Sequence, residues 1–284
     1  MKKIIPLIIL AFTIFTSPPA YADDPSIKID GVAVVSDVHP EVKNSRTMVP
    51  LRVISESLGA KVEWSNSQVT FTKDGMKVTL KPNSNTVVKN GVTVKLDVKP
   101  YVKRNRIFVP LRFIVETFGC KVNYSKSGVT VDTEPLIIEG VQVKALREEY
   151  HMTMGGVVQQ INGNAYNRAI YNMFVHNLGA KVEAPASYSW TINLDVPGSY
   201  YKNGQYDFLD NKGNSLKRFD IYTLLPATYR GEDDTAIQYP EVLVYDGSEQ
   251  QWYLFSESAL GSINHLVNKA FDSGFVKVIS NTVV

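Results

Sequence analysis

The side chains best suited to metal or acid–base chemistry are few in this sequence and widely spaced. Histidine occurs four times, at His39, His151, His176 and His265. A metal site normally draws on several imidazole, thiolate or carboxylate ligands at characteristic close spacings, and none of these histidines has a close partner of that kind. We therefore expect no bound metal and no cofactor, and we interpret each histidine as an isolated surface or core residue.

Other reactive groups also lack partners in sequence. Cys120, the only cysteine, has no neighbouring base and is interpreted as a small buried residue rather than a nucleophile. Ser-His-Asp order and phosphate-binding glycine loops are not found at meaningful spacing. The run Glu232-Asp233-Asp234 is interpreted as solvated, with calcium binding as the alternative. The sequence thus favours a non-catalytic protein.

The strongest pattern is an internal repeat with an offset of sixty residues. Residues 46–67 read RTMVPLRVISESLGAKVEWSNS and residues 106–127 read RIFVPLRFIVETFGCKVNYSKS, with 12 identities in 22 ungapped positions. The same offset relates residues 31–40 to residues 91–100. A duplication of this size is typical of a stacked or paired scaffold whose units bury faces against each other.

Each repeat carries the same local signals. Asp30-Gly31 and Asn90-Gly91 lie between β-forming residues and predict hairpins. A proline suited to a first helical turn, an apolar stripe and a terminal glycine then predict a short helix, from about Pro50 to Gly59 and from about Pro110 to Gly119. Alternating residues after each glycine predict two more strands. The expected unit is strand, strand, helix, strand, strand.

The charged residues of the repeats have a structural interpretation. Each predicted helix carries an arginine and a glutamate four residues apart, which suits an ion pair on the helix face. Another arginine follows the turn before the proline, where a guanidinium could join loops by hydrogen bonds; anion binding is the alternative. The predicted structural motif consists of Arg46, Pro50, Arg52, Glu56, Gly59, Arg106, Pro110, Arg112, Glu116 and Gly119.

These residues resemble a known family. The Asp-Gly or Asn-Gly hairpin, R-x-x-V-P-L-R, the short helix and the L-G-A-K-V junction are similar to the copper amine oxidase N-terminal-like domain, a repeat of exported Gram-positive bacterial proteins. The resemblance covers about residues 27–133. It implies an α+β stalk or accessory module without copper chemistry, because the copper histidines and the tyrosine-derived quinone of the oxidase belong to another, larger domain.

Residues 136–284 show no such resemblance and are predicted to form a separate α+β domain with a mainly antiparallel sheet. The predicted chain organisation is a signal peptide at 1–22, two tandem units of β-hairpin, short helix and β-strands at 23–135, and this domain. Residues 164–178 predict an amphipathic helix, with a diverged third repeat as the alternative. Strands are predicted at 188–196, 201–208 with a hairpin tip at Asn203-Gly204, 216–225, 241–245, 251–255 and 275–279, and a helix at 258–271.

The N-terminus predicts export. Lys2 and Lys3 precede an apolar run, and Ala20-Tyr21-Ala22 offers small residues for cleavage after Ala22. The run ends at Ser17-Pro18-Pro19, short of the roughly 20 apolar residues of a membrane span. We expect a secreted or cell-surface protein without a transmembrane anchor after cleavage.

Charge divides the chain. Residues 23–135 contain 17 Lys and Arg against 12 Asp and Glu, whereas residues 136–284 contain 11 against 16. The halves either attract each other or face different partners. We expect the basic repeats to bind a cell-wall polymer or a surface protein, and we expect no nucleic acid. The candidate wall contacts are Lys43, Lys73, Lys99, Lys103, Arg104 and Lys126.

Aromatic residues gather in the second half. Twelve of the 15 tyrosines lie from position 150 onward, together with Trp190 and Trp252. They fill a core between strands or present flat apolar faces to sugar rings. The candidate exposed ligand contacts are Tyr200, Tyr201, Tyr229 and Tyr239.

Two function classes follow. The favoured one is an exported, non-catalytic binding protein of the cell envelope, in which the repeats attach the chain and residues 136–284 bind a ligand or partner. The alternative is a wall-active hydrolase or other enzyme with its active site in residues 136–284 and the repeats as targeting module. A deep cleft with converging carboxylates, such as Asp195, Asp207 or Glu241, would favour the enzyme.

Overall fold

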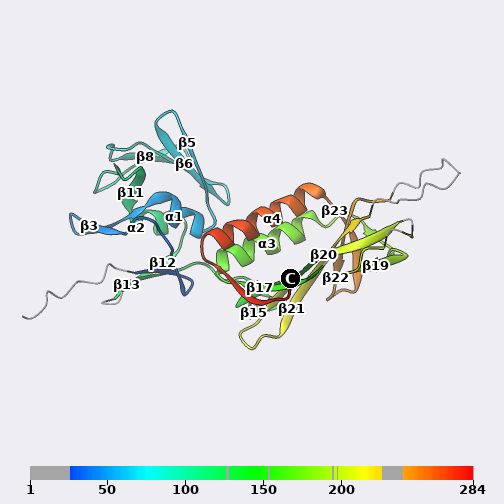
Figure 1. The fold of residues 1–284 in the computed structure, drawn as a ribbon. Helices are drawn as coiled ribbons and strands as arrows, with labels where there is room; N and C mark the ends of the chain where they lie inside the picture. Colours follow the sequence, from blue (N-terminus) through cyan, green and yellow to red (C-terminus); the bar gives the residue numbers. More distant parts are fainter. Residues whose placement is uncertain are drawn as a thin grey trace, which may run out of the picture.

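The chain forms α+β structure with mainly antiparallel sheets (Figure 1). The computed structural model describes residues 26–125, 128–152, 154–193, 195–196, 198–225 and 239–283. The predicted signal peptide, Lys126, Tyr229 and the acidic run at 232–234 lie outside these ranges. Within them, every helix is too short or too polar to span a bilayer.

The two repeated segments form the same elements in the same order. The first contains β1 (Ile27–Ile29), β2 (Val32–Ala33), β3 (Glu41–Lys43), β4 (Arg46–Pro50), α1 (Leu51–Ser57), β5 (Lys61–Ser65) and β6 (Gln68–Lys73). The second contains β8 (Thr86–Lys89), β9 (Val92–Lys95), β10 (Tyr101–Lys103), β11 (Arg106–Pro110), α2 (Leu111–Thr117), β12 (Lys121–Ser125) and β13 (Gly128–Asp132). Between them lies β7 (Met76–Leu80).

The expected order of strand, strand, helix, strand, strand is therefore incomplete. A second hairpin, β3–β4 or β10–β11, precedes each helix. Its turn residues, Asn44-Ser45 and Arg104-Asn105, all have positive φ without any glycine. Sequence reasoning relied on glycine to identify two-residue turns, so these hairpins were missed.

The two segments interlock through their strands. β4 pairs antiparallel with β11 at the centre of the sheet β10-β11-β4-β3, and Val49 lies opposite Val109, its equivalent in the repeat. β1 pairs with β13 of the other segment, whereas β8 and β9 extend the β5-β6-β7 sheet of the first segment. The region does not divide into two self-contained tandem units, because the first hairpin of each segment completes a sheet of the other.

Gly59 and Gly119 end α1 and α2 as predicted. Their φ angles are +84° and +67°, in the left-handed region that glycine enters without steric cost. The N–H groups of Gly59 and Ala60 donate to carbonyls in the last turn of α1, and those of Gly119 and Cys120 do the same in α2. The chain then turns directly into β5 and β12.

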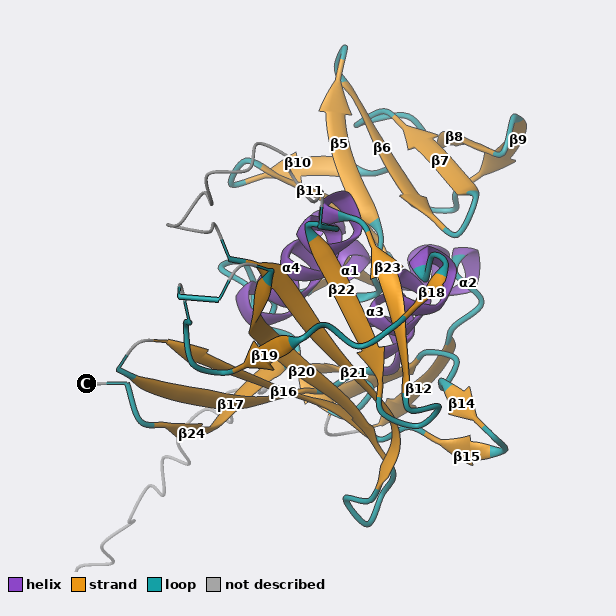
Figure 2. Ribbon diagram, turned by 90° about the vertical axis from the view of Figure 1, so that its right-hand side faces the viewer, coloured by secondary structure: helices purple, strands orange, loops and turns teal. Residues whose placement is uncertain are grey.

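The second part places two long helices on one face of a nine-stranded sheet (Figures 1 and 2). A small hairpin of β14 (Ile137–Ile138) and β15 (Val141–Gln142) leads into it. The helices are α3 (Asn164–Asn177) and α4 (Glu257–Asp272). The strands are β16 (Ala145–Met152), β17 (Gly155–Ile161), β18 (Lys181–Val182), β19 (Ser187–Ser189), β20 (Ser199–Leu209), β21 (Ser215–Leu224), β22 (Val242–Asp246), β23 (Gln251–Phe255) and β24 (Val276–Asn281).

Most of the elements predicted for this part are present near their expected ranges, but two predictions are wrong, and β16, β17 and β18 lie where no strand was predicted. Asn203-Gly204 is not a hairpin tip; it lies inside β20, where the pairing with β21 shifts register as a β-bulge. The turn lies instead at residues 210–214, where the Asp210 carboxylate accepts hydrogen bonds from the N–H groups of Lys212 and Asn214. The strand predicted at 188–196 is reduced to the three residues of β19.

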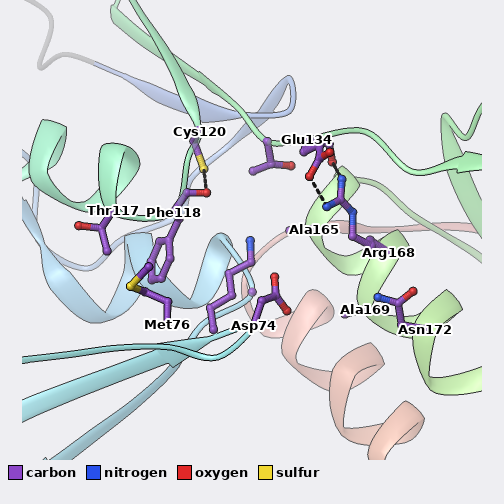
Figure 3. A pocket seen from close by; sticks show the side chains of 13 residues that line it. Asp74, Met76, Thr117, Phe118, Cys120, Glu134, Ala165, Arg168, Ala169 and Asn172 are labelled. Atoms are coloured by element: carbon purple, nitrogen blue, oxygen red, sulfur yellow. Dashed lines mark hydrogen bonds and ion pairs between the residues drawn. The ribbon is translucent and has the colours of Figure 1, made fainter. Parts of the chain in front are cut away.

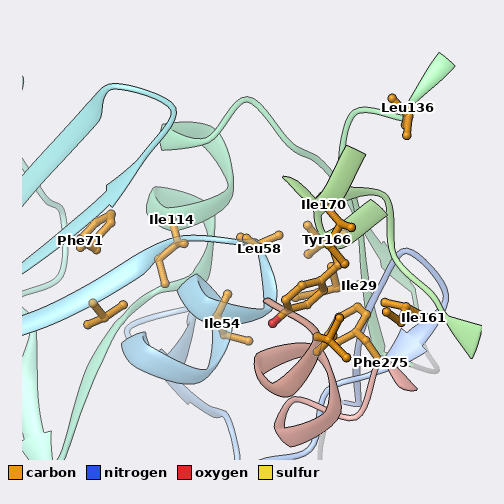
Figure 4. Packing of buried hydrophobic residues seen from close by; sticks show 14 of the residues in the cluster. Ile29, Ile54, Leu58, Phe71, Ile114, Leu136, Ile161, Tyr166, Ile170 and Phe275 are labelled. Atoms are coloured by element: carbon orange, nitrogen blue, oxygen red, sulfur yellow. The ribbon is translucent and has the colours of Figure 1, made fainter. Parts of the chain in front are cut away.

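One continuous cluster of buried apolar residues joins the two parts (Figure 4). Ile54 and Leu58 of α1 belong to the same cluster as Ile170 of α3 and Phe275. Tyr166 lies between them, and its hydroxyl is within hydrogen-bonding distance of the Glu56 carbonyl at 3.1 Å and the Ser273 hydroxyl at 3.2 Å. Apolar packing therefore holds α1 against α3 and α4.

Asp30 adds a polar connection at the same junction. Its carboxylate accepts hydrogen bonds from the backbone N–H and the hydroxyl of Thr133, at 2.8 and 2.7 Å. It also accepts from the backbone N–H of Asn164, the first residue of α3, at 2.8 Å. One side chain in the β1–β2 turn thus fixes both the end of the repeat region and the start of α3.

Replacing Gly119 by Val should destabilise the mature chain, residues 23–284, by about 1 kcal/mol or more, because a β-branched residue resists positive φ. A Cβ at Gly119 would meet nothing within 4 Å, so the effect reports backbone strain rather than a clash. Chemical denaturation measures it. Gly261→Ala is the control, since Gly261 lies within α4 with open space around it and alanine should stabilise the helix there. An unchanged midpoint for Gly119→Val would contradict the assignment.

Asp30→Asn should lower the free energy of unfolding by about 1–3 kcal/mol, because an amide cannot accept all the bonds that the carboxylate accepts, and its N–H₂ group would face donors. Thermal or urea unfolding of residues 23–284 tests this. Asp74→Asn is the matched control: Asp74 also sits in a turn at positive φ, is exposed, and has no hydrogen bond in the described part of the chain. Equal effects of the two substitutions would refute the role of Asp30.

Candidate functional site

The face of the large sheet turned away from α3 and α4 carries a second aromatic cluster. Side chains alternate along a strand, so β21 and β22 direct Phe219 and Val244 into the helix-covered core and Tyr222 and Leu243 to the other face. Trp252 of β23 joins Tyr222 there. The segment between β18 and β19 crosses this outer face in Figure 2. Both faces of these strands therefore carry apolar side chains: one face packs against the helices, and the other forms the second aromatic cluster.

A pocket of about 480 Å³ opens beside this cluster, and we call it the Tyr188 pocket. Its aromatic lining comes from Tyr188, Tyr222, Tyr245 and Trp252. The Tyr188 ring stands edge-on to Trp252, with centroids 4.8 Å apart and an interplanar angle of 69°. Tyr188 remains 47% exposed whereas Tyr222 and Trp252 are buried. The pocket therefore has a fixed aromatic floor and one accessible ring at its margin.

Arg218 and Asp220 of β21 line the polar wall of the Tyr188 pocket and belong to an ion-pair group that extends to β20. Arg218 donates to both carboxylate oxygens of Asp220, at 2.9 and 2.6 Å, and the Lys202 ammonium lies 2.9 Å from the same carboxylate. Asp220 is only 1% exposed, so two cations compensate its buried charge. Burial lowers the pKa of Lys202, and the Asp220 carboxylate opposes part of that shift.

The ion-pair group continues into a stack of side chains on the same face. The Lys202 ammonium lies 4.6 Å from the centroid of the Trp190 ring, which stacks on His151 at 4.1 Å. His151 lies 3.0 Å from the Glu149 carboxylate, and the Tyr201 hydroxyl donates to the His151 carbonyl. Cation–π and stacking contacts of this kind hold rings at fixed orientation.

This arrangement suits binding better than acid–base chemistry. The Asp220 carboxylate already accepts from two cations, so its charge is neutralised locally and its oxygens are engaged. A rigid aromatic floor with guanidinium and amide groups at its edge matches a ligand with one apolar face and hydroxyl groups, such as a sugar. Gln250 and Gln251 contribute the amides.

Sequence analysis did not identify these residues as a site. Arg218, Asp220 and Tyr222 occupy alternate positions of one strand and therefore share a face. This two-residue spacing was the signal in the sequence that could have identified the three side chains as neighbours. Tyr188 and Trp252 join them only through the order of strands in the sheet, which local sequence does not specify.

The four tyrosines expected to be exposed have different surroundings. Tyr200 is 2% exposed, so its expected exposure is wrong: it packs with Tyr222 and donates a hydrogen bond from its hydroxyl to the Pro240 carbonyl. Tyr201 is half-buried, and so is Tyr239, whose ring faces Gly198. Tyr229 lies outside the described residues. Proximity to a turn was a poor guide, because β20 is longer than expected and begins at Ser199.

The carboxylates that would favour an enzyme are not gathered in one pocket. Asp207 is buried and bound by Arg147 at 2.6 Å, whereas Asp195 and Glu241 are exposed, and none of the three lines the Tyr188 pocket. Glu148 lies between the sheet and the helices, where burial raises its pKa and Gln159 donates a hydrogen bond to it at 2.5 Å. These carboxylates do not form an acid–base pair in the pocket.

The arginines of the repeat motif make reciprocal contacts between the two segments. Arg46 donates to Asp97 at 2.5 Å, and Arg106 donates to Asp37 at 2.7 Å, so each arginine reaches the equivalent aspartate of the other repeat. On the helices, Arg112 lies 3.9 Å from Glu116, whereas no ion pair joins Arg52 to Glu56 among the described residues. Pro50 and Pro110 are the last residues of β4 and β11, and each directly precedes the first residue of its helix.

The candidate wall contacts lie on the repeat region. Lys43, Lys99, Lys103 and Arg104 are exposed, and Lys73 is half-buried. The Lys43 ammonium lies over the Tyr101 ring at 4.0 Å, and Lys103 binds Glu41 and helps to lower the pKa of that carboxyl. Lys126 lies outside the described residues.

A polar cavity of about 230 Å³ lies at the junction of the two parts (Figure 3). Figure 3 shows Phe118 and Cys120 on one side and Arg168 and Asn172 of α3 on the other. Arg168 is committed to the Glu134 carboxylate at 2.6 Å and to two carbonyls. Cys120 is half-buried and burial raises the pKa of its thiol, which disfavours the reactive thiolate. This cavity therefore belongs to the structural junction.

The interlocked repeats, their reciprocal arginines and the glycine-ended helices define the N-terminal region. Residues 28–133 match the copper amine oxidase N-terminal domain. The match to this domain agrees with the resemblance expected from the two V-P-L-R segments, and it covers both repeats. It ends before β14, so the Tyr188 pocket lies outside it. No solved structure matches the chain.

The mature chain, residues 23–284, should not retain stoichiometric copper. In the described ranges, no group of three or more His, Cys, Asp and Glu side chains is arranged to hold a metal ion. Elemental analysis of residues 23–284 after loading with Cu²⁺ and desalting should give far less than one copper per chain. One retained copper per chain, reduced by His151→Ala or His39→Ala, would contradict this prediction and identify the ligand.

Proposed function

We propose that this protein is an exported, non-catalytic binding protein of a Gram-positive cell envelope. In this proposal, residues 23–135 attach the chain to the envelope and residues 136–284 bind a sugar-containing ligand in the Tyr188 pocket. The observation that carries the proposal is the pocket itself: an exposed ring over a buried aromatic floor, bordered by Arg218.

The chemistry of the pocket supports a carbohydrate ligand. An exposed tyrosine offers a flat face of low conformational entropy to the C–H groups of a pyranose ring. Arg218 and Gln250 provide donors at the edge for hydroxyl groups, and Gln251, whose amide nitrogen donates to the Val182 and Trp252 carbonyls, offers its amide oxygen as an acceptor. The compensated charge of Asp220 fixes the position of the guanidinium before a ligand arrives, which reduces the cost of ordering it on binding.

The match of residues 28–133 supports an accessory role for the repeats. Export is supported by the basic, apolar and small-residue segments of residues 1–22. Attachment is supported by the excess of basic residues in 23–135, because Gram-positive walls carry anionic polymers. The junction with α3 and α4 would hold the Tyr188 pocket in a fixed position relative to the attached region.

Tyr188→Ala should weaken sugar binding by about fivefold, the loss of about 1 kcal/mol expected for one ring contact. The probe is a neutral N-acetylglucosamine oligosaccharide, titrated into residues 23–284. Isothermal titration calorimetry measures the affinity. The affinity should change little with salt, because this oligosaccharide carries no charge.

Two controls make this test specific. Tyr188→Phe keeps the ring and should retain most of the affinity. Phe271→Ala removes an exposed aromatic residue from α4, which packs on the opposite face of the sheet, and should have no effect. If Tyr188→Ala and Phe271→Ala behave alike, or if the wild-type protein does not bind the neutral oligosaccharide, the sugar-binding proposal is wrong.

A further inference from the structure

The pairing of β4 with β11 relates the two repeats by an approximate twofold axis. Val49 and Val109 are equivalent residues of the repeat, and they lie opposite each other in an antiparallel register. The reciprocal pairs Arg46–Asp97 and Arg106–Asp37 obey the same relation. Any surface feature built from both repeats must therefore occur twice.

Two such features are grooves on the repeat region. The first, which we call the Trp64 groove, has a volume of about 570 Å³ and is formed by α1 and β5 of one repeat with the β10–β11 hairpin of the other. The second, the Tyr124 groove, measures about 310 Å³ and is formed by α2 and β12 with the β3–β4 hairpin. Seven residues line the Tyr124 groove, and for each of them the residue sixty positions away lines the Trp64 groove.

Each groove presents an exposed aromatic ring. Trp64 is 52% exposed and Tyr124 is 48% exposed, and they occupy the same repeat position. Each ring lies on the same strand face as a valine that packs in the core, Val62 or Val122, but about half of each aromatic side chain remains outside that core. An exposed valine of the opposite hairpin, Val102 or Val42, lines the same groove, so each groove carries an exposed apolar patch rather than a single exposed ring, as expected of a binding contact.

Each groove also contains two arginines with different roles. The hairpin arginine, Arg106 or Arg46, is held by the aspartate of the other repeat. The helix arginine, Arg52 or Arg112, keeps unused donors. Arg52 has no hydrogen bond or ion pair among the described residues. Arg112 lies 3.9 Å from Glu116, which is too far for a hydrogen bond. The Arg112 guanidinium lies 5.7 Å from the centroid of the Tyr124 ring. A guanidinium with free donors therefore lies in the same groove as an exposed ring.

From this geometry we infer that the two grooves are paired binding sites for an acidic glycan. The ring of Trp64 or Tyr124 stacks on a sugar, and Arg52 or Arg112 donates to an acidic group on the same chain. The excess positive charge of residues 23–135 complements such a polymer. One long glycan that occupies both grooves gains affinity by avidity.

This inference rests on the attachment role proposed for the repeats and gives that role a defined site. It differs from diffuse attraction by surface lysines, because it requires two particular rings and two particular arginines. It also differs from the Tyr188 pocket, which lies on another part of the chain and is expected to take an uncharged sugar chain.

The test is calorimetric titration of residues 23–284 with three purified polymers at low and at physiological ionic strength. A glycosylated poly(glycerol phosphate) teichoic acid carries phosphate, polygalacturonate carries carboxylate, and dextran is neutral. Both acidic polymers should bind, the phosphate or carboxylate preference should show which group fits, and dextran should not bind the grooves. Trp64→Ala or Tyr124→Ala should each weaken binding by about tenfold or more because avidity is lost, and the double variant should lose binding.

Charge-matched variants separate the grooves from diffuse attraction. Arg52→Gln with Arg112→Gln removes two positive charges within the grooves, and Lys81→Gln with Lys95→Gln removes two outside them, at exposed positions. Only the first pair should weaken binding strongly. Circular dichroism checks that each variant is folded, and Trp64→Phe with the native Tyr124 should retain binding.

Three outcomes would overturn the inference. Equal weakening by the two charge-matched pairs, with no effect of the aromatic variants, would leave the attachment role in place but assign it to diffuse charge. Equal binding of dextran and the acidic polymers, lost alike in the double variant Trp64→Ala with Tyr124→Ala, would refute recognition of an acidic group. Failure of the wild-type protein to bind either acidic polymer or purified walls would overturn both the grooves and the attachment role.

Discussion

The antiparallel pairing of β4 with β11 is the constraint on which the N-terminal region depends. It places equivalent residues of the two repeats opposite each other and fixes their helices on the same sheet. It also brings the β3–β4 hairpin beside α2 and the β10–β11 hairpin beside α1, which creates the reciprocal Arg–Asp pairs. Without this register, neither groove would have its second wall.

Different interactions hold the repeat region against the second part of the chain. Apolar residues of α1 pack with α3 and Phe275, and Asp30 binds the first residue of α3. The Glu134–Arg168 pair crosses the junction with signs opposite to the net charges of the two halves. This ion pair therefore does not arise from attraction between the net positive charge of the repeat region and the net negative charge of the second half.

Local features of the fold could be predicted from sequence because local chemistry determines them. Asp30-Gly31, Asn90-Gly91, Gly59 and Gly119 mark turns and helix ends through backbone conformation alone. The hairpins at Asn44 and Arg104 were missed because residues other than glycine adopt positive φ there. The interlocking of the repeats could not be predicted, since equivalent strands have equivalent sequences and offer no local preference for their own copy as partner.

The candidate site shows the same limit. The alternation of Arg218, Asp220 and Tyr222 was visible in the sequence, but their meeting with Tyr188 and Trp252 depends on strand order and on a segment that crosses the sheet. Tyr200 was misjudged because β20 begins at Ser199, so this tyrosine lies inside a strand of the sheet rather than beside a turn. For both the Tyr188 pocket and Tyr200, the pairing of strands distant in the sequence, rather than local secondary-structure propensity, determines where the side chains lie.

The exchange of hairpins between the repeats also limits how this region can change in evolution. A single sixty-residue copy would leave β4 without its central partner and β1 without β13, exposing unpaired strand edges that favour aggregation. Loss or gain of one copy would therefore leave an unfinished fold, whereas loss or gain of two copies would preserve every pairing. The heritable unit of this module is the pair, and the copy number of such segments should be even.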